Sequence, residues 1–217
     1  MNNKIKHRIL SLVAGLAVFA AAQAVCPNFT DLNSPNVTGF TGSTSNPFAS
    51  SGVVSGRHTL ITAQGTDPNT GGALSFLPAG ESQVIKLGNE RTGAEAEALT
   101  YRFSVDINNA VLLLKFAVVL EDPGHGFIAQ PRFVVRVTDS DGNLTEECAE
   151  YDVSAGGDIP GFQTYQNSSW KTIRWRDWTN IGIDLSRYIG QTVQLQFITY
   201  DCSYGAHFGY EIGRAHV

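Results

Sequence analysis

The chain has 217 residues, of which 42% are hydrophobic, and this is enough for one domain with a sizeable core. Its 20 acidic residues outnumber 15 basic ones, which gives a formal net charge of −5. Nucleic acid requires a basic protein face, so this balance argues against a nucleic-acid partner. An acidic surface is compatible with calcium, with neutral sugars or with solubility alone.

Residues 1–24 have the three parts of a secretory signal peptide: the basic residues Lys4, Lys6 and Arg8, an apolar run, and Ala22-Gln23-Ala24 as a cleavage site. The apolar run is shorter than the roughly 20 residues that a membrane-spanning helix needs. We therefore expect an exported protein, secreted or held at the cell surface, with no membrane span after cleavage.

The mature chain begins with residues 25–51, which are rich in Asn, Ser, Thr, Pro and Gly and predict an irregular, turn-filled segment. Beyond it, short stretches alternate apolar and polar residues with a period of two, which is typical of half-buried strands. These stretches, each bounded by turn residues, predict strands within 53–62, 82–88, 97–106, 130–138, 144–153, 181–185 and 192–199.

Residues 110–120 (AVLLLKFAVVL) are apolar almost throughout and predict a central strand buried on both faces. A helix is the alternative, but the valines and the flanking Asn-Asn and Asp-Pro-Gly turns favour a strand. Nine or ten short strands, close turns and no convincing amphipathic helix predict an all-β fold, an antiparallel β-sandwich spanning residues 25–210.

Several motifs carry a family resemblance. They are Asp184–Phe197 (DLSRYIGQTVQLQF), Asp201-Cys202-Ser203, Gly205–Tyr210, Arg57-His58-Thr59, residues 67–72 and residues 120–133. Together they resemble the jelly-roll modules, similar to galactose-binding-like and MAM-like domains, of large secreted Bacteroidetes surface proteins that also carry PKD repeats. The resemblance implies adhesion or carbohydrate recognition, with an extracellular glycan or a surface protein as partner. A noncatalytic accessory domain of a secreted hydrolase and a structural spacer are the alternatives.

The resemblance implies a further strand and a further cysteine after Tyr210. Residues 211–217 (EIGRAHV) instead match, codon for codon, a sequencing adapter read in frame. We expect these seven residues to be an artefact, the sandwich to lack its final strand, and the protein to be a fragment of a longer one. A genuine short polar tail is the alternative.

Three cysteines, Cys26, Cys148 and Cys202, are an odd number for an exported chain. We expect a Cys148–Cys202 disulfide, with Cys26 having lost a partner on the absent strand, although spacing alone establishes neither pairing. The one cofactor that the sequence suggests is a structural calcium ion, with Asp67 and Asn69 of DPNTGG as oxygen ligands. A plain Asx-type turn explains the same residues.

Candidate ligand-binding residues are the aromatic side chains Trp170, Trp175 and Tyr165, together with His125 in a Pro-Gly-His-Gly loop. Sugar rings stack their apolar faces on such aromatic side chains, although aromatic residues of sandwiches also pack in the core. Three histidines, His58, His125 and His207, could form a zinc site, but their spacing does not bring them together, and packing roles explain them. No catalytic motif is present, so we expect the protein not to be an enzyme.

Overall fold

The computed structural model describes residues 29–144, 150–156, 159–167 and 169–216. Three 3₁₀ helices lie in this part of the chain: η1 (Pro68–Thr70), η2 (Phe127–Ala129) and η3 (Ser186–Tyr188). The strands in the same residues are β1 (Val37–Ser43), β2 (Asn46–Ser51), β3 (His58–Ile61), β4 (Val84–Gly88), β5 (Glu95–Ser104), β6 (Val111–Asp122), β7 (Arg132–Thr138), β8 (Glu150–Ser154), β9 (Phe162–Gln166), β10 (Thr172–Asp184), β11 (Thr192–Tyr200) and β12 (Gly209–His216).

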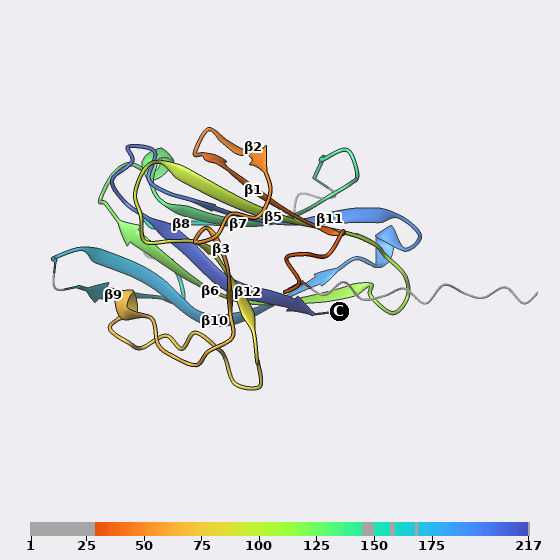
Figure 1. Ribbon diagram of the computed structural model, residues 1–217, viewed down its shortest axis with the longest axis horizontal. Coiled ribbons are helices and arrows are strands. Elements are labelled where there is room, and N and C mark those ends of the chain that lie inside the picture. The colour runs from red at the N-terminus through yellow and green to blue at the C-terminus, as the bar shows by residue number, and fades with distance from the viewer. Residues whose placement is uncertain (1–28, 145–149, 157–158, 168, 217) are drawn as a thin grey trace, which may run out of the picture.

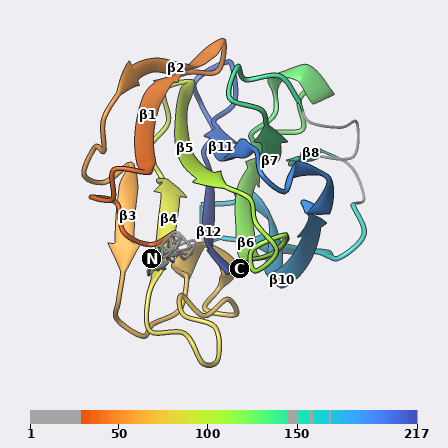
Figure 2. The same cartoon turned by 90° about the vertical axis from the view of Figure 1, so that its right-hand side faces the viewer.

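The strands form two antiparallel sheets that pack face to face (Figures 1 and 2). The first sheet has the order β2-β1-β5-β11-β7-β8, and the second has the order β3-β4-β12-β6-β10-β9. The predicted all-β antiparallel sandwich is therefore confirmed. No helix among the described residues has the length and apolar character needed to cross a membrane.

The main core lies between the two sheets and follows the predicted alternation. On the neighbouring strands β5 and β11 the inward side chains come from alternate positions. Leu99 and Tyr101 of β5, for example, lie beside Phe197 and Leu195 of β11. On β6 the inward positions include Phe116 and Leu120, both without exposed surface. Period-two alternation thus places one apolar face of each sheet against the other.

A second core covers the outer face of the second sheet. The segment between β3 and β4 folds over this face and contributes Leu74 and Leu77, which pack with Ala117 and Val119 of β6. The C-terminal half of β6 is therefore buried on both faces, as predicted. The first half is not, because Val111 is 57% exposed.

The prediction that residues 25–51 are irregular is wrong for β1 and β2, which form a hairpin at the edge of the first sheet. The composition of this segment did not indicate strands, because strand pairing uses backbone groups that every residue has. Strand β1 pairs with β5 along its whole length. The small residues serve close approach: a Cβ at Gly42 would overlap the carbonyl oxygen of Asn46.

The last strand differs from the expected end of the sandwich at Tyr210. Strand β12 continues to His216 and lies inside the second sheet, where it pairs with β4 on one side and β6 on the other. The strand predicted within 181–185 is the end of one long strand, β10, which begins at Thr172 and has an irregularity between Arg176 and Thr179. Residues 211–216 are therefore integral to the second sheet of this structure.

Candidate functional site

An open groove of about 510 Å³ lies where β6 ends and β10 begins. The two strands pair here, with Thr172 opposite Asp122 and Ile173 opposite Glu121, so the end of one strand lies beside the start of the other. Polar and charged side chains dominate the lining, which is formed by Glu121, Asp122, Pro123, Gly124, Trp170, Lys171, Thr172, Arg174 and His207.

Trp170 contributes the groove's indole ring and is 87% exposed. A tight turn presents it: the backbone N–H of Trp170 donates to the carbonyl oxygen of Asn167 at 3.0 Å. The Asn167 side-chain oxygen also accepts the backbone N–H of Lys171 at 3.0 Å. The turn holds Trp170 at a φ of 60°, a left-handed conformation that costs a bulky residue about 1–3 kcal/mol. A large apolar side chain is thus kept in water by a strained backbone.

Two ion pairs hold the charged side chains of the groove. The Lys171 Nζ lies 2.9 Å from Glu121 Oε2, and the Arg174 Nε lies 3.2 Å from Asp122 Oδ2. The guanidinium of Arg174 also donates to Thr164 Oγ1 at 2.7 Å. Because Glu121 is only 3% exposed, its pair with Lys171 anchors the lysine at a defined position. The groove therefore presents fixed donors and acceptors beside an exposed aromatic ring.

The other predicted aromatic ligands lie elsewhere. Trp175 is 4% exposed and belongs to the second core, so it is not a platform for a ligand. Tyr165 is half-buried and packs against the same core, where its ring covers Gly71. The indole N–H of Trp178 donates to the carbonyl oxygen of Ser75. The segment between β3 and β4, which sequence patterning did not place, buries these rings.

Asp67 and Asn69, the predicted calcium ligands, lie at η1 under the second core. The carboxylate of Asp67 is fully buried and accepts the Asn69 backbone N–H at 2.8 Å and the Tyr210 hydroxyl at 2.6 Å. The side-chain amide of Asn69 donates to the same hydroxyl at 3.0 Å. Burial raises the pKa of Asp67. This geometry is that of an Asx-type turn tied to β12.

The structure brings together three residues that the sequence left apart. His125, Cys202 and His207 lie with one potential ligand atom each inside a 4.8 Å span. Cys202 is a fully buried free thiol, so the expected Cys148–Cys202 disulfide is not found; Cys148 and Cys26 fall outside the described residues. No spacing rule predicts this cluster, since strands β7 to β11 separate His125 from Cys202 and His207 in the chain.

The third histidine of the sequence analysis, His58, has a separate packing role. It is 3% exposed, and its ring accepts the Val54 backbone N–H at 3.1 Å while the other nitrogen contacts the Ala98 carbonyl oxygen at 3.1 Å. Burial lowers the pKa of His58 and also that of His207. Both imidazoles are thereby favoured in their neutral form at pH 7.

Comparison with known proteins found no protein-family model and no curated protein that matches the chain. Among solved structures, the chain is similar to TmCBM61 in complex with β-1,4-galactotriose, at 10% sequence identity over 75% of this chain and 83% of that chain, with a TM-score of 0.39. It is also similar to the K1 adhesin domain of Lys-gingipain from Porphyromonas gingivalis (13%, 82% and 95%, TM-score 0.36). A third is the family 11 carbohydrate-binding module from Clostridium thermocellum (9%, 88% and 92%, TM-score 0.33). Similarity at this level carries no argument about function.

Proposed function

We propose that the protein is a noncatalytic module that recognises extracellular glycans, and that it binds them in the groove beside Trp170. The observation that carries this proposal is the exposure of the Trp170 ring, held at a positive φ on the rim of a polar groove. Strained residues cluster at binding sites, because elsewhere selection has no reason to keep the cost. An indole in water beside fixed hydrogen-bonding groups is the surface that a sugar ring requires.

The charges of the groove favour a neutral glycan. Lys171 and Arg174 each pair with a carboxylate, so the four charged side chains sum to zero formal charge. A uronic acid or a sulfated sugar would have to compete with Glu121 and Asp122 for these cations. A neutral sugar can instead use the free donor and acceptor positions of both pairs while its C–H face lies on Trp170. The volume of about 510 Å³ falls within the usual range of ligand sites and holds roughly one or two sugar units.

The setting of the module is part of the same proposal. The signal-peptide pattern of residues 1–24 supports export, and the motif resemblance supports a place near the N-terminus of a larger Bacteroidetes surface protein of the PKD-repeat type. Adhesion to a glycan-bearing surface is then the role of the module in the whole protein.

A neutral-glycan array followed by calorimetry tests the proposal. We expect saturable binding by the full chain and a loss of at least about tenfold in affinity for Trp170→Ala, which corresponds to about 1.4 kcal/mol. The matched control is Ile107→Ala, which removes a similarly exposed apolar side chain (79%) from the turn before β6, at the opposite end of that strand from the groove.

Three results would contradict the proposal. Absence of binding to any neutral glycan by folded protein favours a structural spacer. Equal losses for the two variants would place the binding outside the groove. Binding confined to acidic glycans would contradict the charge argument, because the groove's cations would then be free to act as an anion site.

A further inference from the structure

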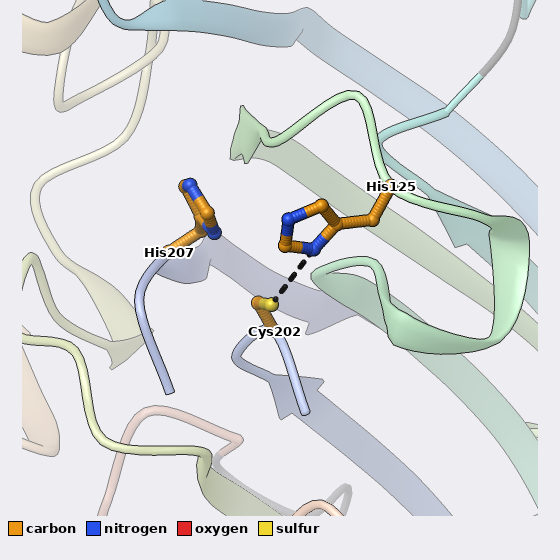
Figure 3. A group of neighbouring side chains, drawn as sticks. All are labelled: His125, Cys202 and His207. Carbon is orange, nitrogen blue, oxygen red and sulfur yellow. Dashed lines mark hydrogen bonds between the residues drawn. The ribbon is translucent and has the colours of Figure 1, made fainter. Parts of the chain in front are cut away.

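The loop after β6 and the connection between β11 and β12 place a sulfur and two imidazoles around one point beside the groove. Figure 3 shows His125 reaching in from the loop after β6, while Cys202 and His207 reach in from the connection between β11 and β12. The Cys202 Sγ lies 3.5 Å from His125 Nδ1, and the ligand atoms of all three residues lie within 4.8 Å of one another. The His125 and His207 rings meet edge to face with centroids 5.2 Å apart.

These distances fit one tetrahedral metal ion. With zinc–sulfur bonds of about 2.3 Å and zinc–nitrogen bonds of about 2.0–2.1 Å, tetrahedral angles put the sulfur about 3.5 Å and the second nitrogen about 3.4 Å from a given nitrogen ligand. The observed Cys202–His125 distance already matches this separation. The widest pair, at up to 4.8 Å, must close by about 1.4 Å, which small shifts of two side chains supply.

The backbone around the cluster holds its ligands in position. The Cys202 N–H donates to the His207 carbonyl oxygen at 2.9 Å, which fixes the two residues across the β11–β12 connection. The Tyr204 N–H donates to the Cys202 sulfur at 3.4 Å, which fixes the position of the sulfur. The buried amide of Gln130 donates to the His125 carbonyl oxygen at 2.7 Å and so anchors the histidine loop. Outer contacts of this kind orient ligands in metal sites.

One polar atom in the cluster has no partner. The Nδ1 of His207 is buried and makes no hydrogen bond to any residue that the structure describes. A buried polar atom without a hydrogen bond is costly, so a group that satisfies it is to be expected at this position. The nitrogen lies on the residue that also lines the groove, so an ion bound there would sit at the groove's edge.

We propose that His125, Cys202 and His207 bind one Zn²⁺ ion, with a fourth position left to water or to a group entering from the groove. Thiolate and imidazole ligands select zinc and similar transition metals, whereas calcium and magnesium take oxygen ligands. Three protein ligands with one open position characterise reactive rather than purely structural zinc sites. This proposal is independent of the glycan proposal, because it rests on other atoms and has its own test.

Cobalt(II) titration of the reduced, metal-free full chain tests the proposal. We expect one Co²⁺ per chain with thiolate-to-cobalt charge-transfer absorption and tetrahedral d–d bands, both abolished when Zn²⁺ displaces the cobalt. Cys202→Ser should remove the charge-transfer absorption. His125→Gln, in an exposed loop where the fold tolerates change, should weaken binding by at least about 100-fold, since even outer contacts are worth 10–100-fold.

The matched control is Cys148→Ser, which should leave the spectrum and the stoichiometry unchanged. Loss of the signal in this variant would overturn the proposal, because it would make Cys148 the thiolate ligand. Intact mass with thiol counting on the unreduced protein gives a second check. A Cys202 found in a disulfide, or a wild-type chain that shows no charge-transfer absorption, would also overturn it.

Discussion

Glu211 offers a sharp test of the structure, because it places a carboxyl group in the main core. The residue is 3% exposed and borders a small cavity of about 10 Å³ together with Leu99, Tyr101 and Phe197. No hydrogen bond or ion pair to its carboxylate is found among the described residues. Burial alone raises its pKa well above the ordinary value of 4.5.

The perturbation is Glu211→Leu, which replaces the carboxyl group by an apolar side chain of similar size. The folded state holds the carboxyl protonated while the unfolded chain ionises above pH 4.5. Unfolding therefore releases a proton, and each pH unit above 4.5 destabilises the wild-type protein by about 1.4 kcal/mol for as long as the folded carboxyl stays protonated. The loss of stability accumulates from pH 4.5 up to the raised pKa of the folded state, and below pH 4.5 it vanishes.

Urea unfolding at several pH values between 4.5 and 7 measures the difference between variant and wild type. We expect the stability advantage of Glu211→Leu to grow with pH, by up to about 1.4 kcal/mol per pH unit. Glu211→Gln should remove the same pH dependence while keeping the shape. The wild type alone is not sufficient, because Asp201, whose pKa burial raises to about 7, titrates in the same range. The difference between the two proteins cancels that contribution.

The control is Glu150→Leu, the same substitution at an exposed position of β8, which should change stability by no more than about 0.5 kcal/mol at any of these pH values. A Glu211→Leu protein less stable than the wild type at pH 7 would refute the reasoning. So would a difference that does not change with pH, because it would mean that the Glu211 carboxylate is solvated or paired in solution.

Two further predictions rest on particular contacts. Trp175→Ala should lower the stability measured by thermal or urea unfolding by about 3–5 kcal/mol, because Trp175 is buried. Trp170→Gly should raise the stability by up to about 1 kcal/mol, because glycine relieves the positive φ. The opposite order would contradict the assignment of Trp175 to the core and Trp170 to the surface. Arg57→Ala should lower the free energy of unfolding by about 3 kcal/mol, because it removes the Nε that lies 2.6 Å from Oε1 of Glu97, a residue only 2% exposed. A loss below about 1 kcal/mol in the same unfolding experiment would show that this ion pair is solvated.

The sequence predicted the sandwich because alternation is a local property of the chain. Every second residue is apolar over 99–103 of β5 and 193–197 of β11, and this alone places Leu99 and Leu195 on inward faces. The same reasoning failed for β1, whose small and polar residues give little alternation although its backbone pairs fully with β5. Pairing that depends on the backbone leaves a weak trace in composition.

The candidate sites depended on contacts between distant parts of the chain. Alternation along β10 puts Trp175 on the face that the segment between β3 and β4 covers. Trp170 lies in the turn before β10, and only the tertiary structure shows that it is left in water. Similarly, His125 meets Cys202 and His207 because β6 and the β11–β12 connection end at the same edge of the sandwich. The local pattern of the sequence therefore determined which face of the alternating strands is apolar. The tertiary structure determined what covers each face and which loops meet. Both of these depend on long-range packing, which no short stretch of sequence encodes.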